Sequence, residues 1–198
     1  VVVLYDLKSG MEYPIGSRSV KVHPDISQNQ IVWIDCGNRC DPGATTFPIG
    51  KYDIETGEEI FRAPGQEEKY NPRISGYRVV WQEREPLPFS LHDVYMFDFN
   101  TDRLHPISVQ RNFLETNTDI DGDRMVWSTE DRIDNVSDVV LLDLNTDIRR
   151  RLTEGLPYGT VTGVAMDGNN VVWTYWRFAA DDLYLYDLST STRRILLT

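Results

Sequence analysis

The sequence has few of the residues on which most enzymatic and metal-binding chemistry depends. Its 198 residues include 2 cysteines and 3 histidines. It contains no Gly-x-Ser-x-Gly nucleophile elbow, no His-Glu-x-x-His zinc motif, no phosphate-binding loop and no dinucleotide fingerprint. His23, His92 and His105 lie far apart along the chain, so they define neither a general base nor a zinc site. We therefore expect no catalytic residues and no metal ligands in this segment.

Basic charge and long apolar runs are also scarce. The chain has 20 Lys and Arg against 31 Asp and Glu, a formal net charge of -11 and a pI near 4.7. Binding to nucleic acid depends on neutralising phosphates, so a nucleic-acid partner is not expected and a cationic protein or peptide is a better match. No run approaches the roughly 18 apolar residues that cross a bilayer, so no membrane span is expected here.

The main positive feature is a repeat. An apolar segment that ends in tryptophan occurs four times, at residues 30–33, 78–81, 124–127 and 170–173. A second apolar segment, containing one aspartate, occurs five times, at Asp6, Asp53, Asp98, Asp143 and Asp187. The period of about 46 residues is within the range typical of repeat architectures.

Each repeat predicts four β-strands. Segments rich in Val, Ile, Tyr and Trp alternate with turns of Gly, Asn, Asp, Ser and Thr, and no stretch shows a helical period of helical length. Four antiparallel strands form one blade of a β-propeller. We predict a single all-β propeller segment over residues 1–198. It would comprise a half blade at 1–19 and blades at about 20–66, 67–112, 113–156 and 157–198. Because four and a half blades cannot close a ring, further repeats of a longer chain are expected.

These repeats resemble the WD40-like (PD40) repeats of the TolB-type β-propeller family. The family pattern is Pro-x-hydrophobic-Ser-x-Gly, then an apolar strand, then Tyr-x-x-Asp-hydrophobic, then Leu-Thr. Residues 71–76, 95–99 and 151–153 resemble it closely, with Gly76 directly after Ser75, whereas the fourth repeat departs from it at 161–164. The resemblance implies an extracytoplasmic location, which means periplasmic, secreted or at the cell surface.

One face of the predicted propeller is the expected binding surface. In a meander of strands a, b, c and d, the a–b and c–d turns lie on one face and the b–c and d–a connections on the other. The b–c connections are predicted to be long and varied, and such connections on a rigid scaffold usually carry binding. The candidate partner-binding residues on this face are Glu83, Arg84, Glu85, Glu130, Asp131, Asp134, Trp176 and Arg177.

Two readings of these candidates stay open. The acidic residues could form a rim that attracts a cationic partner, or the ordinary solvated surface of an acidic protein. Trp176 beside Arg177 could be a binding hot spot, or it could cover the end of a blade.

The residues that recur in every repeat are expected to be structural. The repeated aspartates can accept hydrogen bonds from the backbone N–H groups of the turn that follows. The repeated tryptophans are expected to pack between blades. Residues Asp119–Asp123 resemble part of a calcium loop, but they occupy an a–b turn and no Glu follows at the twelfth position. These two points argue against calcium, which stays the one cofactor hypothesis; no other cofactor is expected.

Cys36 and Cys40 lie in the longest b–c connection. Either they form a disulfide that closes this connection, which would imply an oxidising compartment, or they are two free thiols.

The leading functional hypothesis is a non-catalytic extracytoplasmic propeller that binds a protein or peptide through its b–c and d–a face. The alternative is the propeller domain of an enzyme. That enzyme could be a serine peptidase of the prolyl oligopeptidase type, whose hydrolase domain is not in this segment, or a propeller polysaccharide lyase. Fold alone does not decide between these functions.

Overall fold

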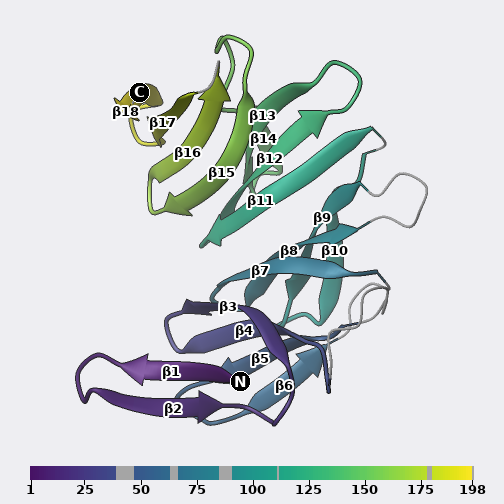
Figure 1. The fold of residues 1–198 in the computed structure, drawn as a ribbon, viewed down its shortest axis with the longest axis vertical. Coiled ribbons are helices and arrows are strands. Elements are labelled where there is room, and N and C mark those ends of the chain that lie inside the picture. Colours follow the sequence, from purple (N-terminus) through teal and green to yellow (C-terminus); the bar gives the residue numbers. More distant parts are fainter. Residues whose placement is uncertain (39–46, 63–66, 85–90, 111, 178–179, 198) are drawn as a thin grey trace.

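The computed structural model describes residues 1–38, 47–62, 67–84, 91–110, 112–177 and 180–197. The described residues form 18 β-strands and contain no helix. Four sheets have four strands each and one has two, and every sheet is an antiparallel meander (Figure 1). The predicted all-β architecture of four and a half blades is therefore confirmed, and the sheets do not close into a ring.

The strands follow the order expected for successive blades, which we call the half blade and blades A to D. The half blade has β1 (Val2–Asp6) and β2 (Met11–Ile15). Blade A has β3 (Lys21–Ser27), β4 (Gln30–Asp35), β5 (Ile49–Asp53) and β6 (Glu59–Arg62). Blade B has β7 (Lys69–Ser75), β8 (Arg78–Arg84), β9 (His92–Asp98) and β10 (Arg103–Ser108). Blade C has β11 (Phe113–Asp121), β12 (Arg124–Asp131), β13 (Val136–Asp143) and β14 (Ile148–Arg151). Blade D has β15 (Thr160–Asp167), β16 (Asn170–Arg177), β17 (Ala180–Asp187) and β18 (Thr192–Leu197).

The first strand of each blade lies innermost. β3 contacts β7, β7 contacts β11, and β11 contacts β15, so these strands line the same side of successive sheets. The last strands, β6, β10, β14 and β18, are the opposite edges of their sheets. Figure 1 shows the blades following one another along the chain, with the N-terminus in the half blade and the C-terminus in blade D. The stacking is that of a propeller.

The four repeated tryptophans form the cores between blades. Trp33, Trp81, Trp127 and Trp173 are each at most 2% exposed. Trp81, for example, packs with Val32, Ile34 and Ile49 of blade A. Truncating a buried Trp costs about 3–5 kcal/mol, so these contacts are a main source of cohesion between blades. The predicted role in inter-blade packing is confirmed.

Turn chemistry explains how each hairpin reverses. The a–b turns of blades B, C and D have Gly76, Gly122 and Gly168 at φ values of 58°, 59° and 54°, a left-handed conformation that glycine adopts without strain. The repeated aspartates act at the c–d turns: Asp53 Oδ1, for example, accepts hydrogen bonds from Glu55 N and Thr56 N, both at 2.9 Å. Their predicted structural role is confirmed.

Each inner strand also carries a β-bulge. In blades A, B and C the ladder register shifts beside His23, Asn71 and Asn117, which have positive φ values of 51°, 48° and 53°. In blade D the shift lies between Val161 and Gly163. The departure of the fourth repeat from the family pattern therefore changes the residues at the bulge, and strand β15 still forms.

Candidate functional site

The two faces of the propeller differ in the length of their connections in blades A and B, but not in blades C and D, where long b–c connections are also predicted. The a–b turns are all two residues, at 28–29, 76–77, 122–123 and 168–169. The b–c connections shorten steadily from residues 36–48 and 85–91 to residues 132–135 and 178–179. Only blades A and B therefore have long b–c connections, because the b and c strands of blades C and D extend through residues predicted to be loops.

This strand extension places most of the candidate residues in strands. Glu83 and Arg84 lie at the end of β8, Glu130 and Asp131 at the end of β12, and Trp176 and Arg177 at the end of β16. Asp134 lies in the β12–β13 turn, and Glu85 lies outside the described residues. They lie on three blades, so the structure does not gather them into one cluster.

Glu83 is buried rather than exposed on the rim. Its residue is 5% exposed, and its Oε2 accepts a hydrogen bond of 2.9 Å from Trp81 Nε1. Lys69 Nζ lies 3.9 Å from the same oxygen, and its side chain is 0% exposed. Burial lowers the pKa of Lys69, while the charges of Glu83 and Glu67 act in the opposite direction. Glu83 therefore belongs to the interior of the blade.

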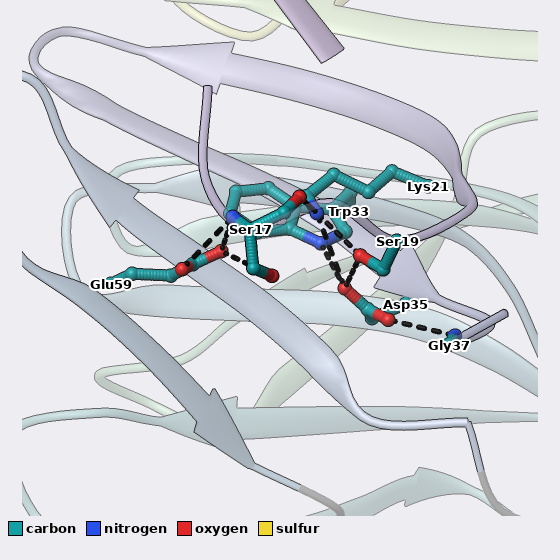
Figure 2. Close-up of polar contacts among 7 residues, drawn as sticks. All are labelled: Ser17, Ser19, Lys21, Trp33, Asp35, Gly37 and Glu59. Carbon is teal, nitrogen blue, oxygen red and sulfur yellow. Dashed lines mark hydrogen bonds and ion pairs between the residues drawn. The ribbon is translucent and has the colours of Figure 1, made fainter. Parts of the chain in front are cut away.

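Blade A has an equivalent arrangement, shown in Figure 2. Lys21 Nζ lies 3.5 Å from Asp35 Oδ2 and bonds to Ser17 O and Ser19 Oγ. Asp35 accepts hydrogen bonds from Ser19 Oγ at 2.6 Å, Gly37 N at 2.8 Å and Trp33 Nε1 at 3.2 Å. Burial acts to raise the pKa of Asp35, but these bonds and the Lys21 charge give a net lowering. The Lys21–Asp35 pair therefore connects residues 17–19, which precede blade A, to Trp33 in β4.

The same position changes chemistry along the chain. Lys21, Lys69, Glu115 and Val161 occupy equivalent places on the inner strands and pair in register with Asp35, Glu83, Thr129 and Tyr175. Blades A and B thus hold a buried ion pair, blade C holds a buried carboxyl opposite a hydroxyl, and blade D is apolar or aromatic there. This series is not among the features predicted from the sequence. Its only signal was that these four residues stand at one fixed spacing before the tryptophan of each repeat.

The candidates of blade C are engaged in local bonds. Asp131 Oδ1 accepts from Ile133 N at 2.8 Å and Asp134 N at 3.3 Å, which is the same turn-capping role as that of the repeated aspartates. Glu130 Oε1 lies 2.6 Å from Arg132 Nη1. Asp134 is exposed. On blade B, Arg84 Nη1 lies 3.6 Å from Glu68 Oε2.

Trp176 and Arg177 differ in surroundings. Arg177 forms a salt bridge with Asp182, and its Nε lies 2.9 Å from Asp182 Oδ2. Trp176 is 48% exposed. Its neighbours Trp173 and Tyr175 pack into the core between blades C and D. Because side chains alternate along a strand, Trp176 faces the other side of blade D, which no described blade covers.

The carboxylates named in the calcium hypothesis all have partners within the protein. Asp119 Oδ2 accepts from Met166 N of blade D at 2.7 Å, and burial raises the pKa of Asp119. Asp121 Oδ2 accepts from Gly168 N at 2.7 Å, and Asp123 pairs with Arg78. Their observed role is to connect blade C with its neighbours.

Of the two cysteines, only Cys36 lies within the described residues. Cys36 is 7% exposed and is not a free thiol. Cys40 lies outside the described residues, so the Cys36–Cys40 disulfide stays a prediction.

Comparison with known proteins adds information at the level of fold. No family model matches the sequence, and no curated protein matches it. Oligogalacturonate lyase in complex with manganese has a TM-score of 0.73 at 14% identity, over 98% of this chain and 58% of that chain. TolB from Acinetobacter baumannii has a TM-score of 0.66 at 13% identity, over 98% of this chain and 48% of that chain.

The β-propeller domain of the Trilobed protease from Pyrococcus furiosus, described as having an open velcro topology, has a TM-score of 0.68 at 13% identity. The match covers 99% of this chain and 60% of that chain. This chain thus spans about half to three fifths of the length of these three structures. The predicted resemblance is confirmed for the fold: the chain is a β-propeller segment with four blades and a half blade, similar in fold to TolB.

Proposed function

We propose that this chain is a binding module that captures a protein or peptide through the face formed by its b–c and d–a connections. The observation that carries the proposal is the difference between the two faces. One has the two-residue a–b turns and the c–d turns at 54–58, 99–102, 144–147 and 188–191, whereas the other has b–c connections that range from residues 36–48 to residues 178–179. Variable connections on a rigid scaffold are where binding usually evolves.

Trp176 is the most informative residue for a test. It lies beside Arg177 at the end of β16 that adjoins this face, and its side chain, 48% exposed, lies on the side of blade D that no described blade covers. Tryptophan and arginine are over-represented among residues that dominate binding energy. The net charge of -11 favours a basic partner. The resemblance to TolB supports the partner-binding role and a location outside the cytoplasm.

Selection of peptides from a random display library against the immobilised chain tests the proposal. We expect the enriched peptides to carry net positive charge and to lose at least tenfold in affinity when Trp176 is replaced by Ala. The control is Tyr77→Ala, because Tyr77 is a 39% exposed aromatic residue beside Arg78 on the opposite face. Failure to enrich any peptide, or equal losses in both variants, would count against binding through this face.

The second candidate is the propeller domain of an enzyme. It is supported by the likeness to oligogalacturonate lyase and to the propeller domain of a protease. The two functions predict different parent chains. A Gly-x-Ser-x-Gly α/β domain in the same reading frame would favour the peptidase, whereas further repeats alone would favour the binding module.

A further inference from the structure

A pocket lies between blades B and C, and its lining is not explained by the packing of the blades. Its volume is about 290 Å³. Blade B and the connection that leaves it contribute Ser108 and Gln110 to the lining, while Glu115, Trp127 and Arg149 of blade C line the other side. We call it the B/C pocket. It lies away from Trp176, so tests of this pocket and of the partner-binding face are independent.

Two residues that line the pocket each have a buried polar atom with no hydrogen-bond partner among the described residues. Glu115 is 1% exposed and Trp127 is 2% exposed, yet Glu115 Oε2 and Trp127 Nε1 both have no partner. The other carboxyl oxygen, Oε1, accepts from Ser108 Oγ at 2.8 Å and from Thr129 Oγ1 at 3.3 Å. Buried polar groups are nearly always paired, with protein, water or ligand. The pocket therefore has unused bonding capacity.

The other blades show that this combination is specific to blade C. In blades A and B the tryptophan N–H donates to a carboxylate, and that carboxylate has a buried lysine beside it. In blade D, Val161 replaces Glu115, so Trp173 has no acid opposite it on the inner strand. Among the described residues, the tryptophan of blade C thus has an unpaired indole N–H beside a buried carboxyl and a pocket.

The charged groups around Glu115 make the pocket electropositive. They are Asp138 on β13 and Arg149, Arg150 and Arg151 on β14, whereas the lining residues from the blade B side are uncharged. Asp138 is neutralised by Arg151, whose Nη1 lies 3.3 Å away. Arg149 donates to Ile107 O at 2.7 Å and places its Cζ 5.9 Å from the centroid of the Trp127 ring. The guanidinium keeps further N–H groups for a ligand.

Glu115 itself adds no net negative charge when it is protonated. Burial raises the pKa of its carboxyl, and the hydrogen bonds from Ser108 and Thr129 offset part of that rise. A protonated carboxyl turns its free oxygen into a donor. The pocket then offers donors from Glu115, Trp127 and Arg149, a set that suits an anion with two acceptor oxygens.

We propose that the B/C pocket binds a carboxylate group, with Arg149 supplying the charge and with Trp127 and Glu115 donating hydrogen bonds to its oxygens. Either a free small carboxylate or an acidic side chain of a peptide could supply this group. No covalent step is involved. The pocket is thus a binding site additional to the partner-binding face proposed above.

Indole ¹H–¹⁵N spectra of the ¹⁵N-labelled chain provide a direct test. Sodium acetate represents the free ligand and acetyl-Ala-Glu-Ala-amide represents the peptide, with sodium chloride at equal ionic strength as the reference. We expect a saturable shift of the Trp127 indole signal, assigned with Trp127→Phe, and no comparable shift of the Trp173 signal. A larger response to one of the two probes identifies the source of the carboxylate.

Matched variants separate binding from a general effect of salt. Arg149→Gln should weaken the response at least tenfold, and Arg151→Gln should also weaken it if the first variant does not fold. Arg193→Gln is the control, because Arg193 occupies the same strand position in blade D and likewise bonds to a carbonyl of the preceding blade, Leu152 O, at 2.9 Å. It should leave the response unchanged.

The role of Glu115 predicts how the response depends on pH. Binding should weaken as the pH rises and Glu115 ionises. Glu115→Gln should retain binding at low pH and remove this weakening, because its amide remains a neutral donor. The proposal is wrong if acetate and chloride shift Trp127 equally, which would indicate an adventitious ion only. It is also wrong if Trp127 does not respond, or if Arg193→Gln weakens the response as much as Arg149→Gln.

Discussion

Replacing Asp35 with asparagine tests whether burial determines how much an ion pair contributes to the stability of this fold. The side chains of Lys21 and Asp35 are 0% and 8% exposed, and the Nζ–Oδ2 distance is 3.5 Å. Removing one partner of a buried pair leaves an uncompensated charge, which typically costs about 3–5 kcal/mol. We expect the free energy of unfolding to fall by an amount toward the lower end of that range.

The contacts of the two side chains explain this estimate. Asp35 Oδ2 accepts from Ser19 Oγ and Trp33 Nε1, and Oδ1 accepts from Gly37 N. Asparagine has one acceptor oxygen, so its NH₂ group must face at least one of these donors, which costs about 1–3 kcal/mol. The remainder comes from the Lys21 ammonium, which loses its charged partner. This cost is limited because Lys21 keeps its bonds to Ser17 O and Ser19 Oγ.

Urea denaturation followed by far-UV circular dichroism measures the effect, with Asp102→Asn as the control. Arg62 Nε lies 2.7 Å from Asp102 Oδ1, but these two side chains are 43% and 65% exposed. An exposed pair contributes about 0–1 kcal/mol, so the control should have little effect. The reasoning is refuted if Asp35→Asn costs no more than Asp102→Asn, although the surface pair has the shorter distance.

The pH dependence provides a second check. The pKa of Asp35 in the folded chain is lowered, since its hydrogen bonds and the Lys21 charge outweigh its burial. A lowered carboxyl pKa stabilises the folded state above the unfolded pKa of about 3.9, and this contribution is lost as the pH falls through the folded value. The stability difference between wild type and Asp35→Asn should therefore shrink below about pH 3.9.

Three further predictions concern other contacts. Replacing Asp119 with Ala removes the acceptor of Met166 N, so stability should fall by about 1–3 kcal/mol and the Met166 amide should exchange faster with solvent. Replacing Gly50 with Ala should destabilise the chain by about 1–3 kcal/mol in urea denaturation, because its Cβ would lie 2.3 Å from the Trp33 indole. Mass spectrometry after alkylation without reductant should leave both cysteines unmodified.

Each of these predictions has its own control. Faster exchange throughout blade A in the Asp119→Ala variant would indicate general unfolding rather than a lost link between blades C and D. The control for the Gly50 variant is Gly76→Ala with its stability compared, since no atom lies within 4 Å of the added Cβ there and only the φ of 58° is unfavourable. If Gly50→Ala were the milder change, close contact with Trp33 would not be the reason for glycine. Alkylation of both cysteines without reductant would rule out the disulfide.

The placement of the site was harder to predict than the blades. The face was chosen from the number of residues between the b and c strands, but this number does not show where pairing stops. Asp131 pairs with Val136 and Arg177 pairs with Ala180, so residues assigned to loops lie in strands. Glu83 was read as part of an acidic rim, and the structure buries it beside Lys69. Lys69 lies on another strand, and a sequence does not show cross-strand neighbours.

The strand order, the turns and the inter-blade role of the tryptophans could all be predicted from the sequence. These features depend on local turn chemistry and on a two-residue alternation that each repeat restates, so neighbouring residues suffice to predict them. Which polar groups are buried together could not be predicted, because it depends on how the strands and blades pack. Lys21 meets Asp35, and Glu115 meets Ser108 and Trp127, only after strands pair and blades stack. Whether a charge is solvated or buried depends on those distant contacts, and the candidate sites depend on it in turn.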